Sequence, residues 1–214
     1  MATIRLKYSE RRSAYFPEWE FYLVSSDERL IGGCWGVPLA WDGTVGDLPG
    51  GFTGSLVRAV TGHEEGVVPN TFVLMAAAVR SDEQGRGHSS RVITAVRDRA
   101  VAGGLGRVLA PVRPTLKSRY PLTPIETFMT WTRADGLPLD PWLRTHVRLG
   151  ATVLAPAPAS QTMTGSVAEW EEWTGMVFPS SGVYTIPAGL TTLAVDRAAD
   201  LGTYVEPNIW LRHA

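Results

Sequence analysis

Apolar residues gather in short runs along the chain, separated by polar segments that contain glycine or proline. Near the N-terminus, residues 18–24 and 30–39 are rich in aromatic and branched side chains, with a polar turn at residues 25–27. Two such runs around a short turn predict an antiparallel hairpin. A glycine-rich loop over residues 41–54 and a short helix over residues 55–61 are expected to follow.

The central third has the most regular pattern. Thr71–Val79 is almost continuously apolar, which is typical of a buried central strand. A polar segment with two glycines, residues 81–90, separates it from the next run. Beyond that segment, apolar residues recur at helical spacing, at Val92, Ile93, Val96 and Ala100. Arg107–Val112 is a second apolar strand, so the centre is predicted as strand, glycine turn, helix, strand.

The last hundred residues are less regular, and prolines interrupt a long connection over residues 114–140. A helix that starts on Pro141 and stops at Gly150 follows it. The expected elements after that helix are a strand at 151–155, a turn or strand end at 155–160, a helix at 167–173, and strands at 183–186, 190–195 and 204–211. The chain contains no internal repeat and no segment that would divide it, so residues 1–214 are predicted to form a single domain.

Composition narrows the class of protein. Of the 214 residues, 44% are hydrophobic and 19% charged, which is typical of a globular chain, and the formal net charge of −1 gives no global basic field for nucleic acid. The single cysteine, Cys34, lies in an apolar run and is interpreted as a packing residue; it favours a reducing, cytoplasmic setting. The N-terminus lacks the apolar block of a signal peptide, and no window is apolar enough to span a membrane.

The glycine turn carries the chemistry. The first backbone N–H groups of a helix lack intrahelical partners, and the helix dipole is positive at that end. Gly85 and Gly87 allow the backbone to approach a phosphate closely, and Ser89 and Ser90 add small hydroxyl donors. This turn after a buried strand is therefore predicted to bind an anion.

Two families use such a turn. The dinucleotide-binding fold has G-x-G-x-x-G, but here Ser90 stands where the third glycine would be, and no acidic residue for a ribose follows about 20 residues later. The second resemblance is to the GNAT superfamily of acyl-CoA-dependent acyltransferases, whose apolar strand leads to Arg or Gln, two residues, Gly, one residue, then Gly or Ala. Gln84 and Gly87 match that pattern, and Ser89 departs from it with another small residue.

A second match to the GNAT superfamily comes later in the chain. Members often have a helix that ends in Tyr-x-x-x-Gly before a strand, and here His146 occupies the tyrosine position before Gly150. The resemblance covers residues 72–154. The N-terminal part lacks the two helices that normally follow the first strand in the family, and the 114–140 segment resembles no common family element.

The resemblance implies an α/β (mixed α+β) fold with a GNAT-like central, mostly antiparallel twisted sheet, a splayed strand pair and flanking helices. It implies acetyl-CoA or another acyl-CoA as co-substrate, and direct attack on the thioester by an amine of a small-molecule acceptor. A backbone N–H near Ala76 would polarise the thioester carbonyl. The donor-binding residues that it implies are Ala77 and Val79 on the strand and Gln84, Gly85, Arg86, Gly87, His88, Ser89 and Ser90 in the loop. No metal site is expected.

The resemblance also suggests residues for proton transfer. His146 is the candidate acid for the leaving thiolate, and its alternative is a helix-face histidine. Glu126, in the long connection, is the candidate general base. Other acidic groups, including Asp82, Glu83 and the cluster at residues 63–65, are interpreted as solvated surface charges.

A local basic stretch follows the Arg107–Val112 strand. It is interpreted either as a binding site for an acidic acceptor, a ribose phosphate or a carrier's phosphate, or as a solvated loop. Its residues are Arg113, Lys117, Arg119 and Tyr120.

Three alternatives remain open from the sequence. The donor could be an acyl-carrier protein or an aminoacyl-tRNA in place of acyl-CoA, although the weakly acidic net charge argues against tRNA. The domain could also be a non-catalytic ligand-binding module, because the Thr71–Val79 strand carries no glutamate and His146 replaces the usual tyrosine. Apart from these alternatives, the aromatic-rich C-terminal strands favour association of the chain into a homodimer.

Overall fold

The computed structural model describes residues 2–213, except for the side chains of residues 2–7 and 9. One sheet of eight strands has the order β1-β2-β3-β4-β8-β7-β6, and β5 pairs with β8 outside that path. The strands are β1 (Glu20–Val24), β2 (Leu30–Leu39), β3 (Thr71–Val79), β4 (Arg107–Val112), β5 (Thr152–Gly165), β6 (Gly182–Thr185), β7 (Thr192–Asp196) and β8 (Leu201–His213). Only β3 and β4 run parallel among these pairs, so the predicted mostly antiparallel sheet is confirmed.

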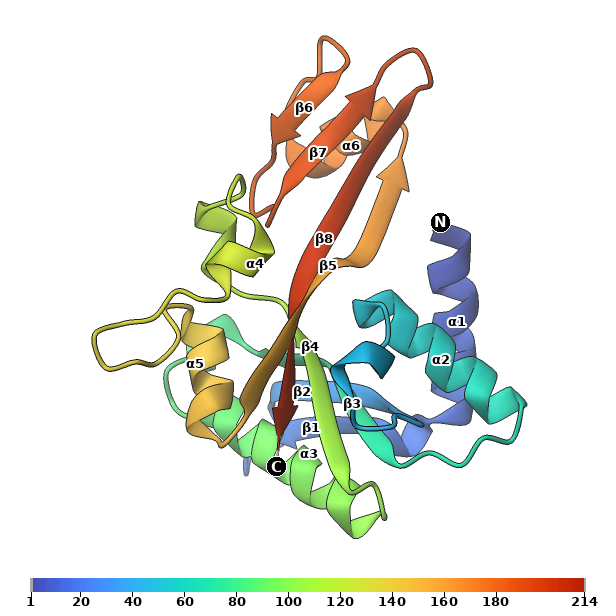
Figure 1. Cartoon of the computed structure of the whole chain (residues 1–214), viewed down its shortest axis with the longest axis vertical. Helices are drawn as coiled ribbons and strands as arrows, with labels where there is room; N and C mark the ends of the chain where they lie inside the picture. Colours follow the sequence, from blue (N-terminus) through green and yellow to red (C-terminus); the bar gives the residue numbers. More distant parts are fainter. Residues whose placement is uncertain (1, 214) are drawn as a thin grey trace.

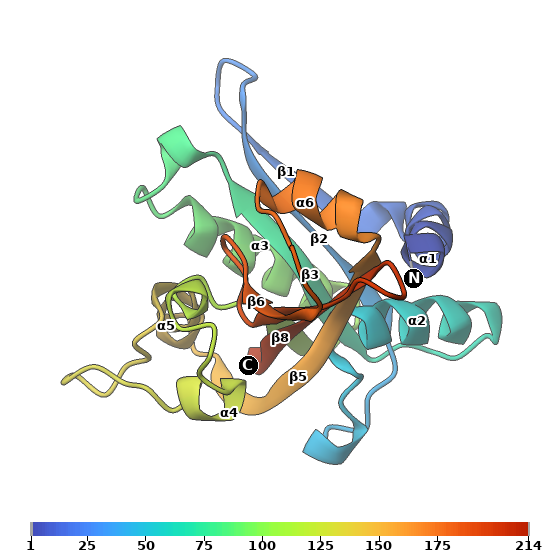
Figure 2. The ribbon, with the colours of Figure 1, turned by 90° about the horizontal axis from the view of Figure 1, so that it is seen from above.

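Six α-helices flank the sheet. They are α1 (Ala2–Tyr15), α2 (Gly51–Glu64), α3 (His88–Ala102), α4 (Ile125–Phe128), α5 (Pro141–Arg148) and α6 (Val167–Thr174). Helices α1 and α2 lie side by side, and α2 also packs on β2 and β5, whereas α3 packs on β3 and β4 (Figures 1 and 2). The sequence pattern did not predict α1, and it placed α2 too short, because Gly51 and Gly54 were interpreted as loop residues.

Two hydrophobic cores share the sheet. The larger lies among β2, β3, β4, α2 and α3, and includes Val37, Phe72 and Leu109, each with no measurable exposed surface. The smaller packs α6 against β7 and β8, with Trp170 and Phe178 at its centre. It forms the extension at the top of Figure 1, where β6 and β7 stand beyond the ends of β1 to β4.

Strands β5 and β8 are far longer than the sequence pattern predicted. They form an antiparallel ribbon that joins the two cores, and β8 pairs with β4 near its C-terminal end and with β7 near its start. The prediction of a turn or strand end at residues 155–160 is wrong, because β5 continues through them. A register shift between Ala157 and Gln161 accommodates the proline-containing segment as a bulge, where a missing ladder N–H is tolerated.

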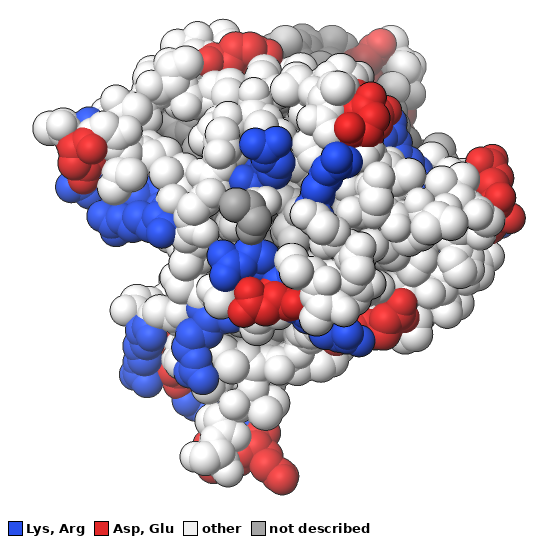
Figure 3. All heavy atoms as spheres, turned by 60° about the horizontal axis from the view of Figure 1, so that its bottom comes forward, with Lys and Arg blue, Asp and Glu red and all other residues white. Residues whose placement is uncertain are grey.

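Several smaller predictions can be compared with the structure. The β1–β2 hairpin is confirmed, and so is the packing role of Cys34, whose burial raises the pKa of its thiol to about 12. None of the described helices is both long and apolar enough to cross a membrane. On the face seen in Figure 3, basic and acidic side chains are interspersed, in keeping with the formal net charge of −1.

Candidate active site

Strands β3 and β4 separate after a short parallel contact. They pair only through residues 71–73 and 107–109, although β3 continues to Val79 and β4 to Val112. A cavity of about 250 Å³ opens at this splay, lined by residues of β3, β4, α5, β5 and β8. Beyond residue 73, no described strand pairs with the edge of β3 that faces β4, so its N–H and C=O groups can bind an extended ligand.

The glycine loop lies at the far end of β3 from that parallel contact. Gly85 and Gly87 both have φ of 78°, a left-handed conformation that favours glycine, and α3 begins directly after Gly87. No side chain caps the N-terminus of this 15-residue helix, so its first N–H groups are available to an anion. Gln84 is exposed, and its Nε2 donates to the Val79 carbonyl at 3.4 Å. The loop therefore presents unpaired N–H groups at a helix N-terminus, where an anion can bind.

Glu83 lies directly before the glycine loop, and its buried carboxylate contacts residues on both sides of Gly87. The interpretation as a solvated charge is wrong for this residue, because Glu83 is only 4% exposed. Its carboxylate accepts hydrogen bonds from Arg29 and from Nη1 of Arg86, the latter at 2.9 Å, and lies 3.5 Å from Nε2 of His88. These contacts hold the loop in one shape and leave an excess of basic groups near it.

His146 lines the cavity from α5. Asp140 caps that helix by accepting from the N–H groups of Trp142 and Leu143, both at 2.9 Å. The imidazole is 1% exposed, and its Nδ1 lies 2.9 Å from Nε2 of His213. Burial, with a smaller contribution from His213, lowers the pKa of His146 to about 3. The imidazole is therefore neutral at pH 7 and lacks the imidazolium proton that the candidate acid would give to the thiolate.

The wall formed by β8 and β5 supplies polar groups that the sequence pattern missed. Glu206, Asn208 and Gln161 all line the cavity. Asn208 accepts from the hydroxyl of Ser160, which in turn accepts from the Phe52 N–H at 2.7 Å and so fixes the start of α2. No motif in the sequence marks these residues, because only the register of the long β5–β8 ribbon turns them toward the splay.

Of the four residues predicted to bind substrate, the fold places only Arg113 at the cavity. Arg113 lines the cavity, where its Nε donates to Glu206 at 3.0 Å. Lys117 is 1% exposed and its Nζ donates to the carbonyls of Tyr120 and Leu190, so its position contradicts a substrate-binding role. Arg119 and Tyr120 do not line the cavity either, and Tyr120 packs edge-on against Trp131 with ring centroids 4.9 Å apart.

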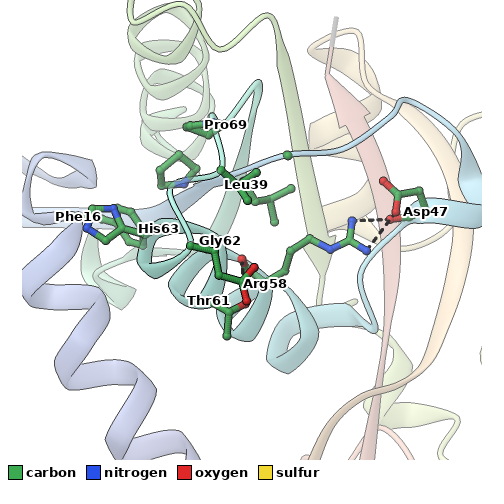
Figure 4. Close-up of a pocket in the computed structure, with 13 residues that line it drawn as sticks. Phe16, Leu39, Asp47, Arg58, Thr61, Gly62, His63 and Pro69 are labelled. Atoms are coloured by element: carbon green, nitrogen blue, oxygen red, sulfur yellow. Dashed lines mark hydrogen bonds and ion pairs between the residues drawn. The ribbon is translucent and has the colours of Figure 1, made fainter.

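Glu126 and the charged cluster at residues 63–65 lie away from the cavity. Glu126 is exposed on α4 and does not contribute to the cavity lining. His63 and Glu65 border a separate hollow of about 280 Å³ at the C-terminal end of α2, whereas the cavity contacts the N-terminal end of that helix (Figure 4). In that hollow Arg58 pairs with Asp47 at 3.2 Å. In the part of the chain that is described, no three His, Cys, Asp or Glu residues form a group that could hold a metal ion.

Comparisons with known proteins agree with this geometry. No family model matches the chain. The chain is 30% identical over 188 residues to the arginine N-acetyltransferase avaD of Aspergillus versicolor, and the match covers 78% of this chain and 65% of that relative. The chain thus spans slightly less than two thirds of the relative's length.

Two solved structures share the fold. The loading GNATL domain of CurA from Lyngbya majuscula has a TM-score of 0.59 at 14% identity, over 97% of this chain and 81% of that one. The GphF GNAT-like decarboxylase, in complex with isobutyryl-CoA, has a TM-score of 0.57 at 16% identity, over 95% of this chain and 82% of that one. This chain therefore has the fold of these GNAT structures.

The sheet topology settles one alternative from the sequence. A dinucleotide-binding fold has a mostly parallel, doubly wound sheet. The described residues of this chain form a single parallel pair, β3–β4, within an otherwise antiparallel sheet. The dinucleotide interpretation of the glycine loop is therefore wrong.

Proposed function

We propose that this chain is a member of the GNAT superfamily and transfers an acyl group from acyl-coenzyme A to an amine of a small-molecule acceptor. The observation that carries the proposal is the cavity at the β3–β4 splay, because β3 leads directly from that cavity to the uncapped N-terminus of α3. A thioester can then lie in the cavity while its pyrophosphate reaches the glycine loop. The relative named as an arginine N-acetyltransferase supports an amine as acceptor.

In this proposal the donor lies along the open edge of β3. Ala77 and Val79 would pair with the pantetheine arm as an added strand does, and the N–H near Ala76 would polarise the thioester carbonyl. The loop from Gln84 to Ser90 would bind the pyrophosphate through backbone N–H groups and the serine hydroxyls. Acetyl-CoA is the simplest donor of this class.

His146 has a narrower role in the proposal than the sequence pattern implied. A neutral imidazole is a poor proton donor, but it can donate one hydrogen bond through its N–H. No described residue hydrogen-bonds to Nε2 of His146, and the ring lines the cavity. We infer that the Nε2–H tautomer stabilises the negative charge that develops on the thioester oxygen or the departing sulfur.

Two measurements test the proposed function. Calorimetric titration with acetyl-CoA at two salt concentrations reports donor binding, and micromolar affinity is the expected result. Release of free thiol is then followed with a panel of amines that includes arginine and with no amine added. Thiol release that depends on an amine supports the transferase, and mass spectrometry should find the acylated amine.

Other outcomes distinguish the alternatives. Donor binding without turnover on any amine would favour a non-catalytic module. No binding of acetyl-CoA, together with transfer from an acyl-carrier protein, would favour a carrier-protein donor. An affinity for aminoacyl-tRNA that falls steeply with salt would favour the tRNA donor.

A further inference from the structure

Glu206 is the one carboxylate among the described residues that line the cavity. It lies on β8 and is 8% exposed. Its Oε1 accepts from Nε of Arg113 at 3.0 Å, and its Oε2 accepts from the hydroxyl of Tyr204 at 3.2 Å. A carboxylate removed from water in this way needs a cation close by, and Arg113 supplies that cation.

The two partners of Glu206 differ in how firmly they are held. Tyr204 is 2% exposed, and its hydroxyl also accepts from the Leu190 N–H at 2.7 Å, so it is fixed in place. The side chain of Arg113 is 47% exposed, and its second contact is to the Ala188 carbonyl at the surface. Water can replace both contacts of the guanidinium if it swings outward, whereas Glu206 stays in position against Tyr204.

We propose that Glu206 is the subsite for a cationic acceptor, and that Arg113 occupies this subsite until a guanidinium group of the acceptor displaces it. The inference rests on the proposed transferase function and names the class of its acceptor. A guanidinium already fits at this carboxylate, because the chain places one of its own there. The amides of Asn208 and Gln161 line the same cavity and can hydrogen-bond to uncharged parts of the acceptor.

A rival arrangement uses the same residues in the opposite way. Arg113 could bind a carboxylate of an anionic acceptor, while Glu206 only orients the guanidinium. The two arrangements predict opposite effects of removing Arg113. If Arg113 competes with the acceptor, its loss strengthens the binding of a cation; if Arg113 binds the carboxylate of an anionic acceptor, its loss weakens the binding of that anion.

The test uses agmatine, which carries a guanidinium and an amine, and N-carbamoylputrescine, which keeps the amine but has an uncharged ureido group in place of the guanidinium. Both are titrated calorimetrically into the full chain, with and without saturating coenzyme A. We expect agmatine to bind wild type at least tenfold more tightly than the analogue. Glu206→Gln should abolish that difference, and Arg113→Gln should lower the Kd of agmatine severalfold. Arg148→Gln and Glu172→Gln change exposed charges on α5 and α6 and serve as matched controls.

Equal affinity of wild type for agmatine and its analogue would overturn the proposal without any variant. Unchanged or weaker agmatine binding in Arg113→Gln, with an unchanged urea unfolding midpoint, would overturn the displacement of Arg113 by the acceptor. These titrations do not require turnover. A chain that binds agmatine through Glu206 but never transfers an acyl group would therefore refute the proposed function and not the subsite.

Discussion

Nδ1 of His146 lies 2.9 Å from Nε2 of His213, although 67 positions separate the two residues in the sequence. Burial is the largest cause that lowers the pKa of each ring, to about 3 for His146 and about 4 for His213. Both rings are therefore neutral at pH 7 and share one N–H···N hydrogen bond. This pairing joins the helix that follows the long connection to the last strand of the sheet, directly beside the cavity.

The histidine pair should make the fold sensitive to acid. Because the folded-state pKa values lie below the ordinary value of 6.5, the unfolded chain binds more protons between about pH 4 and pH 6.5. Stability from the pair is complete above about pH 6.5 and should fall below it, by about 1.4 kcal/mol per pH unit for each histidine. Urea unfolding of wild type and of His146→Phe/His213→Leu between pH 4 and 7 measures the difference, which should shrink as the pH falls. The exposed His63→Gln should keep the wild-type slope; a double variant that does so as well would contradict the assignment.

Turnover should not follow the ionisation of His146. We expect His146→Phe to lower kcat by about 100-fold, because a hydrogen bond to developing negative charge is lost. The loss should be uniform from pH 6 to 9, since the imidazole is neutral throughout that range. The pH profiles of kcat for wild type and the variant measure this directly. A wild-type inflection near pH 6.5 that the variant lacks would show that His146 titrates, and full activity of the variant would remove it from the mechanism.

Gly87→Glu should abolish donor binding. The carboxylate would lie at the N-terminus of α3, where the pyrophosphate is proposed to bind, and would repel it. Gly136→Glu is a matched control, because Gly136 has φ of 76° against 78° for Gly87 and an added Cβ meets no atom within 4 Å at either position. Calorimetric titration with acetyl-CoA should detect binding in the control alone. Unchanged affinity in Gly87→Glu would overturn the assignment of the loop.

Lys117→Met should destabilise the protein without changing acceptor binding. The ammonium group donates to the Tyr120 and Leu190 carbonyls in a buried position, and the substitution removes both hydrogen bonds, although the Tyr120 carbonyl still accepts from the Thr123 N–H. We expect a loss of about 2 kcal/mol in the free energy of unfolding, measured in urea. Arg119→Met changes a neighbouring exposed charge and should have little effect on stability. If Lys117→Met instead raised the KM for the acceptor at unchanged stability, the substrate-binding interpretation of this residue would be correct after all.

The sequence pattern predicted the central unit because the signals there are local. The apolar run of β3, the two glycines before α3 and the helical spacing of Val92 and Val96 each act within a few residues. The structure has the strand, the positive φ values and the helix where those signals placed them. Pro141 and Gly150 bounded α5 in the same way, through the fixed φ of proline and the left-handed conformation of glycine.

The acceptor side of the site was not predictable from such signals. Glu206 lies in a strand segment with no catalytic motif, and Glu126 was the more conspicuous carboxylate because it follows the predicted strand in a proline-rich loop. The sequence predicts Lys117 as a cation of a substrate-binding or solvated loop, but in the structure its ammonium donates to the Tyr120 and Leu190 carbonyls. In each case the decisive contact joins residues that are distant in sequence or depends on which face of a strand points inward.

By itself, the sequence determined the strand–loop–helix unit at residues 71–102, the resemblance to the GNAT superfamily, and the two glycines with positive φ before α3. These features follow from backbone propensity and hydrophobic spacing, which act over a few residues. Only the tertiary structure decided that His146 is neutral beside His213, that Glu83 is buried beneath the loop, and that Glu206 and Arg113 meet in the cavity. Burial and electrostatics depend on what the long β5–β8 ribbon brings together, and the register of that ribbon is set by contacts between segments far apart in the chain.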